Sequence, residues 1–159
     1  MTPDVAAVMA SAGTHVPAVS ADTYAQILQF YARHMQLLDA GSAEEWAEGF
    51  TEDGVFAQNV KPEPWKGRSH IATSMRRGVD RLAGRNVQRR HWFSMVVAVP
   101  ESAGAGEEEA VRTQYYAVVF ETPHGGKASV YLSTTGEDVL VRRAGRWLIK
   151  HRDINHDGS

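Results

Sequence analysis

The chain has 159 residues, 43% of them hydrophobic, and its 17 Lys and Arg residues are nearly balanced by 19 Asp and Glu residues. This length predicts one globular domain with its own core, and the formal net charge of −2 argues against a protein that binds nucleic acid by neutralising phosphates. The absence of cysteine excludes disulfides, thiolate metal sites and a cysteine nucleophile.

Residues 1–20 are rich in Ala, Val, Ser, Pro and Gly with weak periodicity, which predicts a flexible N-terminal arm. The arm has no basic start and Asp4 interrupts its apolar residues, so we expect no signal peptide. No segment has the run of about 20 apolar residues that a membrane helix needs. We therefore expect a cytoplasmic protein with no membrane partner, a single domain over 21–156 and a tail over 157–159.

The first half of the chain predicts three helices. Apolar residues recur at three- and four-residue spacing after a capping residue, Ser20 or Asp22, and Gly41 marks the end of this first helix. A capping box at 42–45 begins a second helix, and a third covers 67–84. The residues expected to face inward are Tyr24, Ile27, Leu28, Tyr31, Met35 and Leu38 in the first helix, Trp46, Ala47 and Phe50 in the second, and Ile71, Met75, Val79 and Leu82 in the third.

After the third helix the apolar pattern alternates, which predicts strands. Four strands are expected, with Gly-rich turns between them. Helices followed by an antiparallel sheet define an α+β fold. The predicted strands are 91–99, 111–122, 128–142 and 146–154. Within each of three strands, alternation places one set of side chains on a common face. These sets are His91, Phe93, Met95, Val97 and Val99 in the first strand, Ser129, Tyr131, Ser133 and Thr135 in the third, and Trp147, Ile149, His151 and Asp153 in the fourth.

A basic run begins in the third predicted helix and continues beyond it. We interpret it as a solvated helix face, with an acidic partner protein as the alternative. The run consists of Arg76, Arg77, Arg81, Arg85, Arg89 and Arg90.

Three stretches of sequence resemble a known family. They are 38–41 leading through Trp46 into 50–56, then 65–71 with its G-R-x-x-I pattern, and Arg90-His91 together with 145–152. In this order they resemble the NTF2-like superfamily, in particular its SnoaL-like proteins and their polyketide cyclase and scytalone dehydratase-like branch. The resemblance implies an α+β cone, in which N-terminal helices pack on a strongly curved antiparallel sheet around an internal apolar pocket. It also implies a homodimer formed through the other face of the sheet.

His91 and Asp39 are the first candidates for catalysis. Alternation points His91 into the pocket, where a neutral imidazole both takes and gives a proton. The dehydratase branch has a catalytic His at the matching strand start and a catalytic Asp at the end of the first helix, so the resemblance implies that Asp39 orients His91 or holds water. The alternatives are a core histidine bonded to a backbone carbonyl and an aspartate that serves the turn before Gly41.

A pocket tyrosine, Tyr31 or Tyr115, would polarise a substrate carbonyl, although such tyrosines also occur as packing residues. His151 with Asp153 is a second possible acid–base pair. The Asn that the dehydratase branch carries on the third strand is missing, which counts against a dehydratase of that type. The residues expected to bind substrate are His34, Trp46, Phe50, Phe56, Trp65, Met75, Phe93, Met95, Ser129 and Tyr131.

These observations lead to two main hypotheses. The first is a cofactor-independent acid/base enzyme that dehydrates, cyclises or isomerises an aromatic polyketide intermediate in secondary metabolism, with no metal. The second is a non-catalytic binding or accessory protein that assists a polyketide tailoring oxygenase. A third hypothesis, an epoxide hydrolase, needs two carboxylates and an arginine in the pocket, and only Asp39 can be placed there from the sequence.

Overall fold

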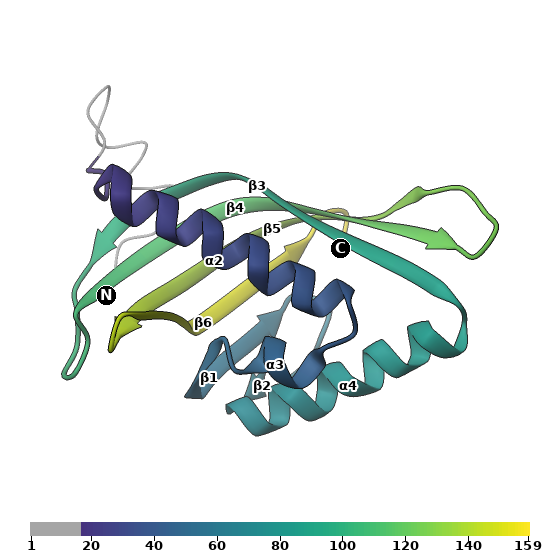
Figure 1. The fold of residues 1–159 in the computed structure, drawn as a ribbon, viewed down its shortest axis with the longest axis horizontal. Coiled ribbons are helices and arrows are strands. Elements are labelled where there is room, and N and C mark those ends of the chain that lie inside the picture. Colours follow the sequence, from purple (N-terminus) through teal and green to yellow (C-terminus); the bar gives the residue numbers. More distant parts are fainter. Residues whose placement is uncertain (1–16) are drawn as a thin grey trace.

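A computed structural model describes residues 17–159 of the chain (Figure 1). Within this range, three helices and six strands follow one another. None of these helices has the length and apolar character needed to cross a membrane. The elements are α2 (Ala21–Asp39), α3 (Ala43–Ala47), β1 (Phe50–Gln58), β2 (Trp65–Lys66), α4 (Arg68–Gly84), β3 (Val87–Glu101), β4 (Glu109–Pro123), β5 (Ser129–Arg143) and β6 (Arg146–His156).

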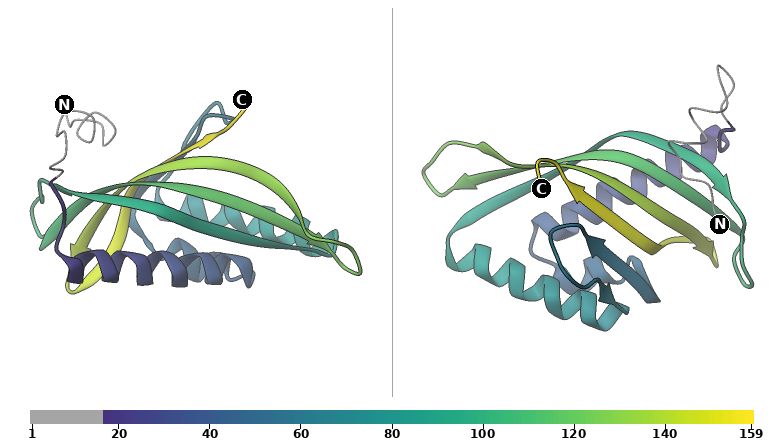
Figure 2. Two further views of the ribbon diagram at one scale, coloured as in Figure 1. Left: turned by 90° about the horizontal axis from the view of Figure 1, so that it is seen from above. Right: turned by 180° about the vertical axis from the view of Figure 1, so that it is seen from behind.

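The strands form one sheet in the order β2-β1-β6-β5-β4-β3. Neighbouring strands are antiparallel except β1 and β6, which run parallel. The sheet bends strongly, α2 lies across its inner face, and α4 packs against α3 and β1 (Figure 1, Figure 2). The predicted α+β cone is therefore confirmed, with the parallel β1–β6 pair as a feature that the sequence pattern did not indicate.

The first helix begins and ends close to where the sequence predicts. The Ser20 side chain accepts a hydrogen bond from the Thr23 backbone N–H at 3.1 Å, which satisfies one of the free donors at the helix start. After α2 the chain turns at Gly41, whose φ of +85° favours glycine. Ile27, Tyr31, His34, Met35 and Leu38 are buried along the face of α2 that packs on the sheet.

The second helix is shorter than predicted. It ends at Ala47, and Phe50, which was expected on its inner face, instead begins β1 as a fully buried residue. Gly49 lies between them, where an added Cβ would sit 2.8 Å from the His34 ring. Only a residue without a side chain fits this close to His34. The helix therefore ends before Gly49, earlier than the sequence pattern predicts.

The sheet has a register shift in the β1–β6 pair, between Phe50 and Val55, and three β-bulges, in β3, β5 and β6, that change which side chains face the inside of the cone. In β3 the bulge lies between Ser94 and Val97, where Met95 has a φ of +53° and a side chain that is 73% exposed. The predicted alternation of His91, Phe93 and Met95 is therefore wrong from Met95 onward, because the extra residue shifts the pattern. The bulges in β5 and β6 lie at Tyr131 and Lys150.

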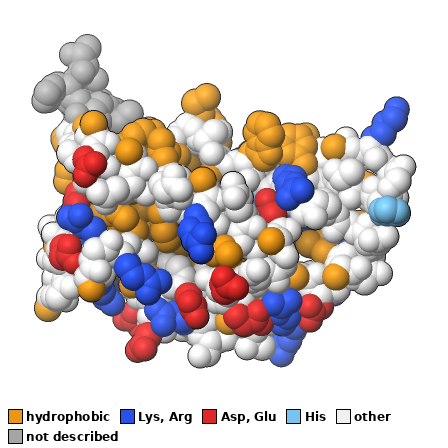
Figure 3. Space-filling view, in the orientation of Figure 1, with side chains coloured by type: hydrophobic (Ala, Val, Ile, Leu, Met, Phe, Trp, Pro, Cys, Tyr) orange, Lys and Arg blue, Asp and Glu red, His pale blue; other side chains and the backbone are white. Residues whose placement is uncertain are grey.

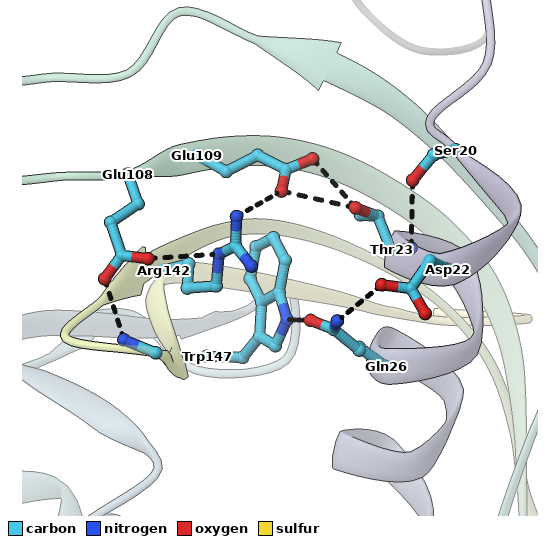
Figure 4. A network of polar contacts seen from close by, with 9 residues as sticks. Ser20, Asp22, Thr23, Gln26, Glu108, Glu109, Arg142 and Trp147 are labelled. Atoms are coloured by element: carbon cyan, nitrogen blue, oxygen red, sulfur yellow. Dashed lines mark hydrogen bonds and ion pairs between the residues drawn. The ribbon is translucent and has the colours of Figure 1, made fainter.

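Polar contacts fix the beginning of α2 on the sheet (Figure 4). Thr23 Oγ1 donates to the Glu109 carboxylate at 3.1 Å, and the same carboxylate pairs with Arg142 Nη2 at 3.1 Å. Trp147 Nε1 donates to Gln26 Oε1 at 2.9 Å. These contacts join α2 to β4, β5 and β6, so they set the direction in which the helix crosses the sheet.

The predicted N-terminal arm, 1–20, lies outside the described residues except for 17–20. α2 begins at Ala21 and β6 ends at His156. Asp157 remains attached to the sheet, since its backbone N–H donates to the Ser133 carbonyl at 3.0 Å and Ser133 Oγ donates to its carboxylate at 2.7 Å.

Candidate active site

A cavity of about 990 Å³ lies between the helices and the inner face of the sheet. Its walls come from all three helices and from all six strands, so residues far apart in the sequence meet around it. Six of the ten residues predicted to bind substrate line it. They are Trp46, Phe56, Trp65, Met75, Phe93 and Tyr131.

Asp39 and His91 lie together on the cavity wall, although 52 residues separate them in the sequence. His91 Nδ1 is 2.6 Å from Asp39 Oδ1, and the His91 backbone N–H donates to Asp39 Oδ2 at 3.0 Å. The last residue of α2 therefore holds both the main chain and the ring of a residue in β3. The Asp39 side chain is 6% exposed and that of His91 is 19% exposed.

This geometry sets the tautomer of His91. Because Nδ1 faces a carboxylate, it carries the proton and donates it, which leaves Nε2 as the basic nitrogen. Nε2 has no hydrogen-bond partner among residues 17–159. The pair thus has the arrangement of a general base with an orienting carboxylate, in which the carboxylate also stabilises the imidazolium after proton transfer.

A second polar cluster lies behind the cavity wall and centres on Asp138. Its carboxylate is fully buried and accepts four hydrogen bonds, which leaves it well satisfied. Arg152 Nε and Nη2 donate at 3.0 and 2.8 Å, Tyr115 at 3.0 Å and Tyr31 at 2.8 Å. The Tyr31 oxygen also lies 2.5 Å from Thr113 Oγ1.

The structure does not place Tyr31 and Tyr115 where the sequence predicted. Neither lines the cavity, and both hydroxyls donate to Asp138 instead of facing a ligand. Burial raises the pKa of both tyrosines well above the ordinary value, and for Tyr31 the nearby Asp138 carboxylate is the second cause. Both hydroxyls therefore remain protonated. The structure therefore does not bring these two hydroxyls to the cavity, where a pocket tyrosine would act, because the buried carboxylate accepts the hydrogen bonds of both.

Arg152 is the residue of this cluster that reaches the cavity. It is 1% exposed, and its guanidinium carbon lies 5.2 Å from the centre of the Phe93 ring. Burial alone would lower the pKa of Arg152, but the Asp138 carboxylate raises it above the ordinary value, so the guanidinium stays charged. The sequence pattern does not indicate this residue, since the Lys150 bulge reverses the alternation in β6.

The same bulge removes the second predicted acid–base pair. His151 and Asp153 are exposed, whereas Arg152 and Ile154 face the cavity. In β5, likewise, Leu132 and Thr134 line the cavity, and Ser129 is exposed at the start of the strand. Ser129 and Met95, both expected to bind substrate, do not line this cavity, because Met95 lies at the β3 bulge and Ser129 is exposed at the start of β5.

His34 and Phe50 are core residues rather than cavity residues. His34 is buried, donates from Nε2 to the Trp46 carbonyl at 2.8 Å and stacks on the Trp46 ring. Burial, with a smaller contribution from Arg152, lowers the pKa of His34 well below 6.5, so the ring is neutral. Both were expected to bind substrate, and the structure places them behind the cavity, where their rings pack against Trp46, which does line it.

Metal-ligating residues do not cluster in residues 17–159: no group of three or more His, Asp and Glu side chains there could hold a metal ion.

Helices on the inner side of a bent sheet, with a cavity between them, define an NTF2-like cone. Within this class the chain belongs to the SnoaL-like family, because the model of the SnoaL-like domain matches residues 19–153. None of the curated proteins matches the chain.

Several solved structures are similar. A protein from Catenulispora acidiphila is 37% identical, with a TM-score of 0.75 over 86% of this chain and 93% of that one. A structure from the same organism in complex with S-DNPA is also 37% identical, with a TM-score of 0.74 over 87% of this chain and 96% of that one. Aln2 from a Streptomyces species is 30% identical, with a TM-score of 0.77 over 88% of this chain and 94% of its own. ActVI-ORFA from Streptomyces coelicolor is 29% identical, with a TM-score of 0.78 over 88% of this chain and 98% of its own.

Proposed function

We propose that the protein is a cofactor-independent acid/base enzyme that dehydrates, cyclises or isomerises an aromatic polyketide intermediate. The observation that carries this proposal is the Asp39–His91 pair on the wall of the cavity, with Nε2 of His91 free of protein partners among residues 17–159. The aromatic walls Trp46, Phe56 and Trp65 suit a flat ring system. The similarity to Aln2 and ActVI-ORFA from Streptomyces supports a role in secondary metabolism.

In this proposal His91 Nε2 removes a proton from a carbon next to a substrate carbonyl. The C–H bond breaks, its electron pair forms an enolate, and the proton stays on the imidazole, whose new charge Asp39 stabilises. In a dehydration the imidazolium then gives this proton to the departing hydroxyl, and water leaves as the double bond forms. In an isomerisation it returns the proton to another carbon of the enolate.

The alternative is a protein that binds an unstable intermediate without converting it, or assists an oxygenase. One observation favours it: Tyr31 and Tyr115 are engaged by Asp138, so neither supplies a hydroxyl to a ligand carbonyl. An epoxide hydrolase is a weaker fit, because Arg152 lines the cavity but Asp138, its carboxylate partner, does not.

A homodimer through the outer face of the sheet is the second part of the proposal. Trp92 and Tyr116 on this face are 65% and 57% exposed, and Val130 is 62% exposed. Large exposed apolar side chains on one face are typical of an interface. Sedimentation velocity tests this: the dimer should dissociate in Trp92→Glu, and a wild-type protein that sediments as a monomer would contradict it.

The catalytic proposal is tested by incubating the protein without cofactor with hydroxylated aromatic polyketide intermediates, followed by mass spectrometry. His91→Gln should abolish the loss of water or the new isomer. His151→Gln is the matched control, because His151 is exposed and does not line the cavity. Product formed equally by His91→Gln would remove His91 from the reaction, and compounds that bind unchanged to the wild type would favour the binding protein.

A further inference from the structure

The charges around the cavity differ from those of the whole chain. The chain as a whole carries a formal charge of −2, but the side chains that line the cavity include five Lys and Arg residues and one acidic residue, Asp39. The five cationic residues are Lys61, Arg81, Arg85, Arg89 and Arg152.

Two of these five cations have an acidic partner. Arg89 pairs with Glu121 at 2.7 Å, and Arg152 pairs with Asp138. Lys61, Arg81 and Arg85 form no ion pair within residues 17–159. Arg81 and Arg85 lie near the end of α4, and they belong to the basic run whose sequence pattern predicts a solvated face.

The outer part of α4 carries both paired and unpaired cations, since Arg77 is exposed there and forms no ion pair within residues 17–159. Arg76 pairs with Glu44 and Asp80 there. On the face shown in Figure 3, basic and acidic side chains intermix along the lower edge, where Figure 1 places α4. The cavity lining therefore carries three cations without an acidic partner among residues 17–159, and together they create a positive potential there.

Arg152 lies deeper in the cavity and has one edge in use. Asp138 binds the edge formed by Nε and Nη2, so the other edge, formed by Nη1 and the second proton of Nη2, remains. No hydrogen bond to Nη1 is made within residues 17–159. Arginine binds a carboxylate through two parallel N–H groups, and this remaining edge provides them.

Fold stability does not require a buried guanidinium at this position. Replacing a buried ion pair by apolar residues of similar volume is often neutral or stabilising. A guanidinium that is buried, held rigidly by Asp138 and placed on a cavity wall is instead suited to binding an anion. Its position is fixed before a ligand arrives, which lowers the entropic cost of binding.

We propose that the cavity selects aromatic ligands that carry a carboxylate, and that this carboxylate binds the free edge of Arg152. Lys61, Arg81 and Arg85 at the entrance attract such ligands. The inference rests on the proposed function to the extent that the cavity is the ligand site, and it adds the charge of the ligand.

Binding of a matched pair of fluorescent probes, anthracene-2-carboxylate and anthracene-2-carboxamide, tests this. The wild type should bind the acid about 10-fold or more tightly than the amide, as expected for hydrogen bonds to a charged group. In the double variant Asp138→Asn/Arg152→Gln, which removes both charges together, the preference should fall to about 1-fold while the affinity for the amide stays the same. Equal binding of the two probes by the wild type, or a preference retained in the double variant, would overturn the inference.

A second comparison does not depend on the buried pair. Arg81→Gln/Arg85→Gln should slow association of the acid at low salt several-fold, since long-range attraction is screened by salt. Arg77→Gln is the matched control, because Arg77 is exposed on the same helix and does not line the cavity. An equal effect of Arg77→Gln would contradict an attraction centred on the cavity.

The outcomes separate the two proposals. Turnover that depends on His91, combined with equal binding of acid and amide, would retain the proposed function and overturn this inference. A preference for the acid that depends on Arg152, with no turnover of any compound, would retain this inference and favour a binding protein.

Discussion

Asp138→Asn is expected to destabilise the fold more than any exposed charge substitution. The carboxylate is fully buried and accepts hydrogen bonds from Tyr31, Tyr115 and two nitrogens of Arg152. Asparagine removes the charge and turns an amide N–H₂ group toward these donors, so Arg152 is left buried without a counter-ion. Breaking such a pair costs about 3–5 kcal/mol, a large share of the roughly 5–15 kcal/mol that stabilises a domain.

A double-mutant cycle in urea measures this, with Asp138→Asn, Arg152→Gln and the double variant followed by tryptophan fluorescence and circular dichroism. The double variant should lose about 2 kcal/mol less free energy of unfolding than the two single variants lose in sum, because it leaves no unpaired charge. Asp80→Asn is the control: its side chain is 65% exposed and pairs with Arg76 on the surface, so we expect a change below about 1 kcal/mol. A cost below about 1 kcal/mol for Asp138→Asn, or simple additivity, would refute the reasoning.

Three further predictions concern the fold around the site. Gly136→Ala should cost about 3 kcal/mol in the same urea assay, because the new Cβ would lie 2.2 Å from the buried Tyr115 ring, and a cost near zero would contradict this close packing. In the unfolded chain His34 binds a proton below about pH 6.5, whereas in the folded protein the lowered pKa of His34 keeps it neutral. The free energy of unfolding of the wild type should therefore fall by up to about 1.4 kcal/mol per pH unit below that pH, and His34→Gln should reduce this slope. An unchanged slope would mean that His34 is protonated in the fold. Ser20→Ala should lower the free energy of unfolding by about 1 kcal/mol through loss of the helix cap, which thermal unfolding would detect, and an unchanged midpoint would show that water replaces the cap.

The sequence predicts the parts of this protein that depend on regular periodicity. The 3.6-residue pattern of α2 is confirmed by its buried stripe, and the cap at Ser20 and the turn at Gly41 follow from local chemistry. The meeting of Asp39 and His91 is different, since 52 residues separate them. Their proximity was expected only from the resemblance to a family, and the structure supplies the distances.

Regular alternation fails where a strand contains one extra residue. Met95 in β3, Tyr131 in β5 and Lys150 in β6 each shift the pattern by one position, and no residue type marks these bulges in the sequence. The largest consequence lies in β6, where Arg152 rather than His151 faces inward. Sheet curvature requires such bulges, so errors of this kind concentrate on the strands that form the cavity wall.

His91 and Arg152, two of the polar residues that line the cavity, are held by opposite means, and this difference suits different tasks. The imidazole of His91 is oriented at one nitrogen by Asp39, while its other nitrogen remains free to exchange a proton. The guanidinium of Arg152 keeps its charge because Asp138 raises its pKa, so it offers a fixed cation and does not act as an acid or a base. A site with one group that transfers a proton and one that only binds charge can hold an acidic ligand at one end and act on it at the other. The carboxylate partners are therefore as important as the groups they hold, because in the proposed reaction Asp39 determines which nitrogen takes the proton, and Asp138 determines which edge of Arg152 is free.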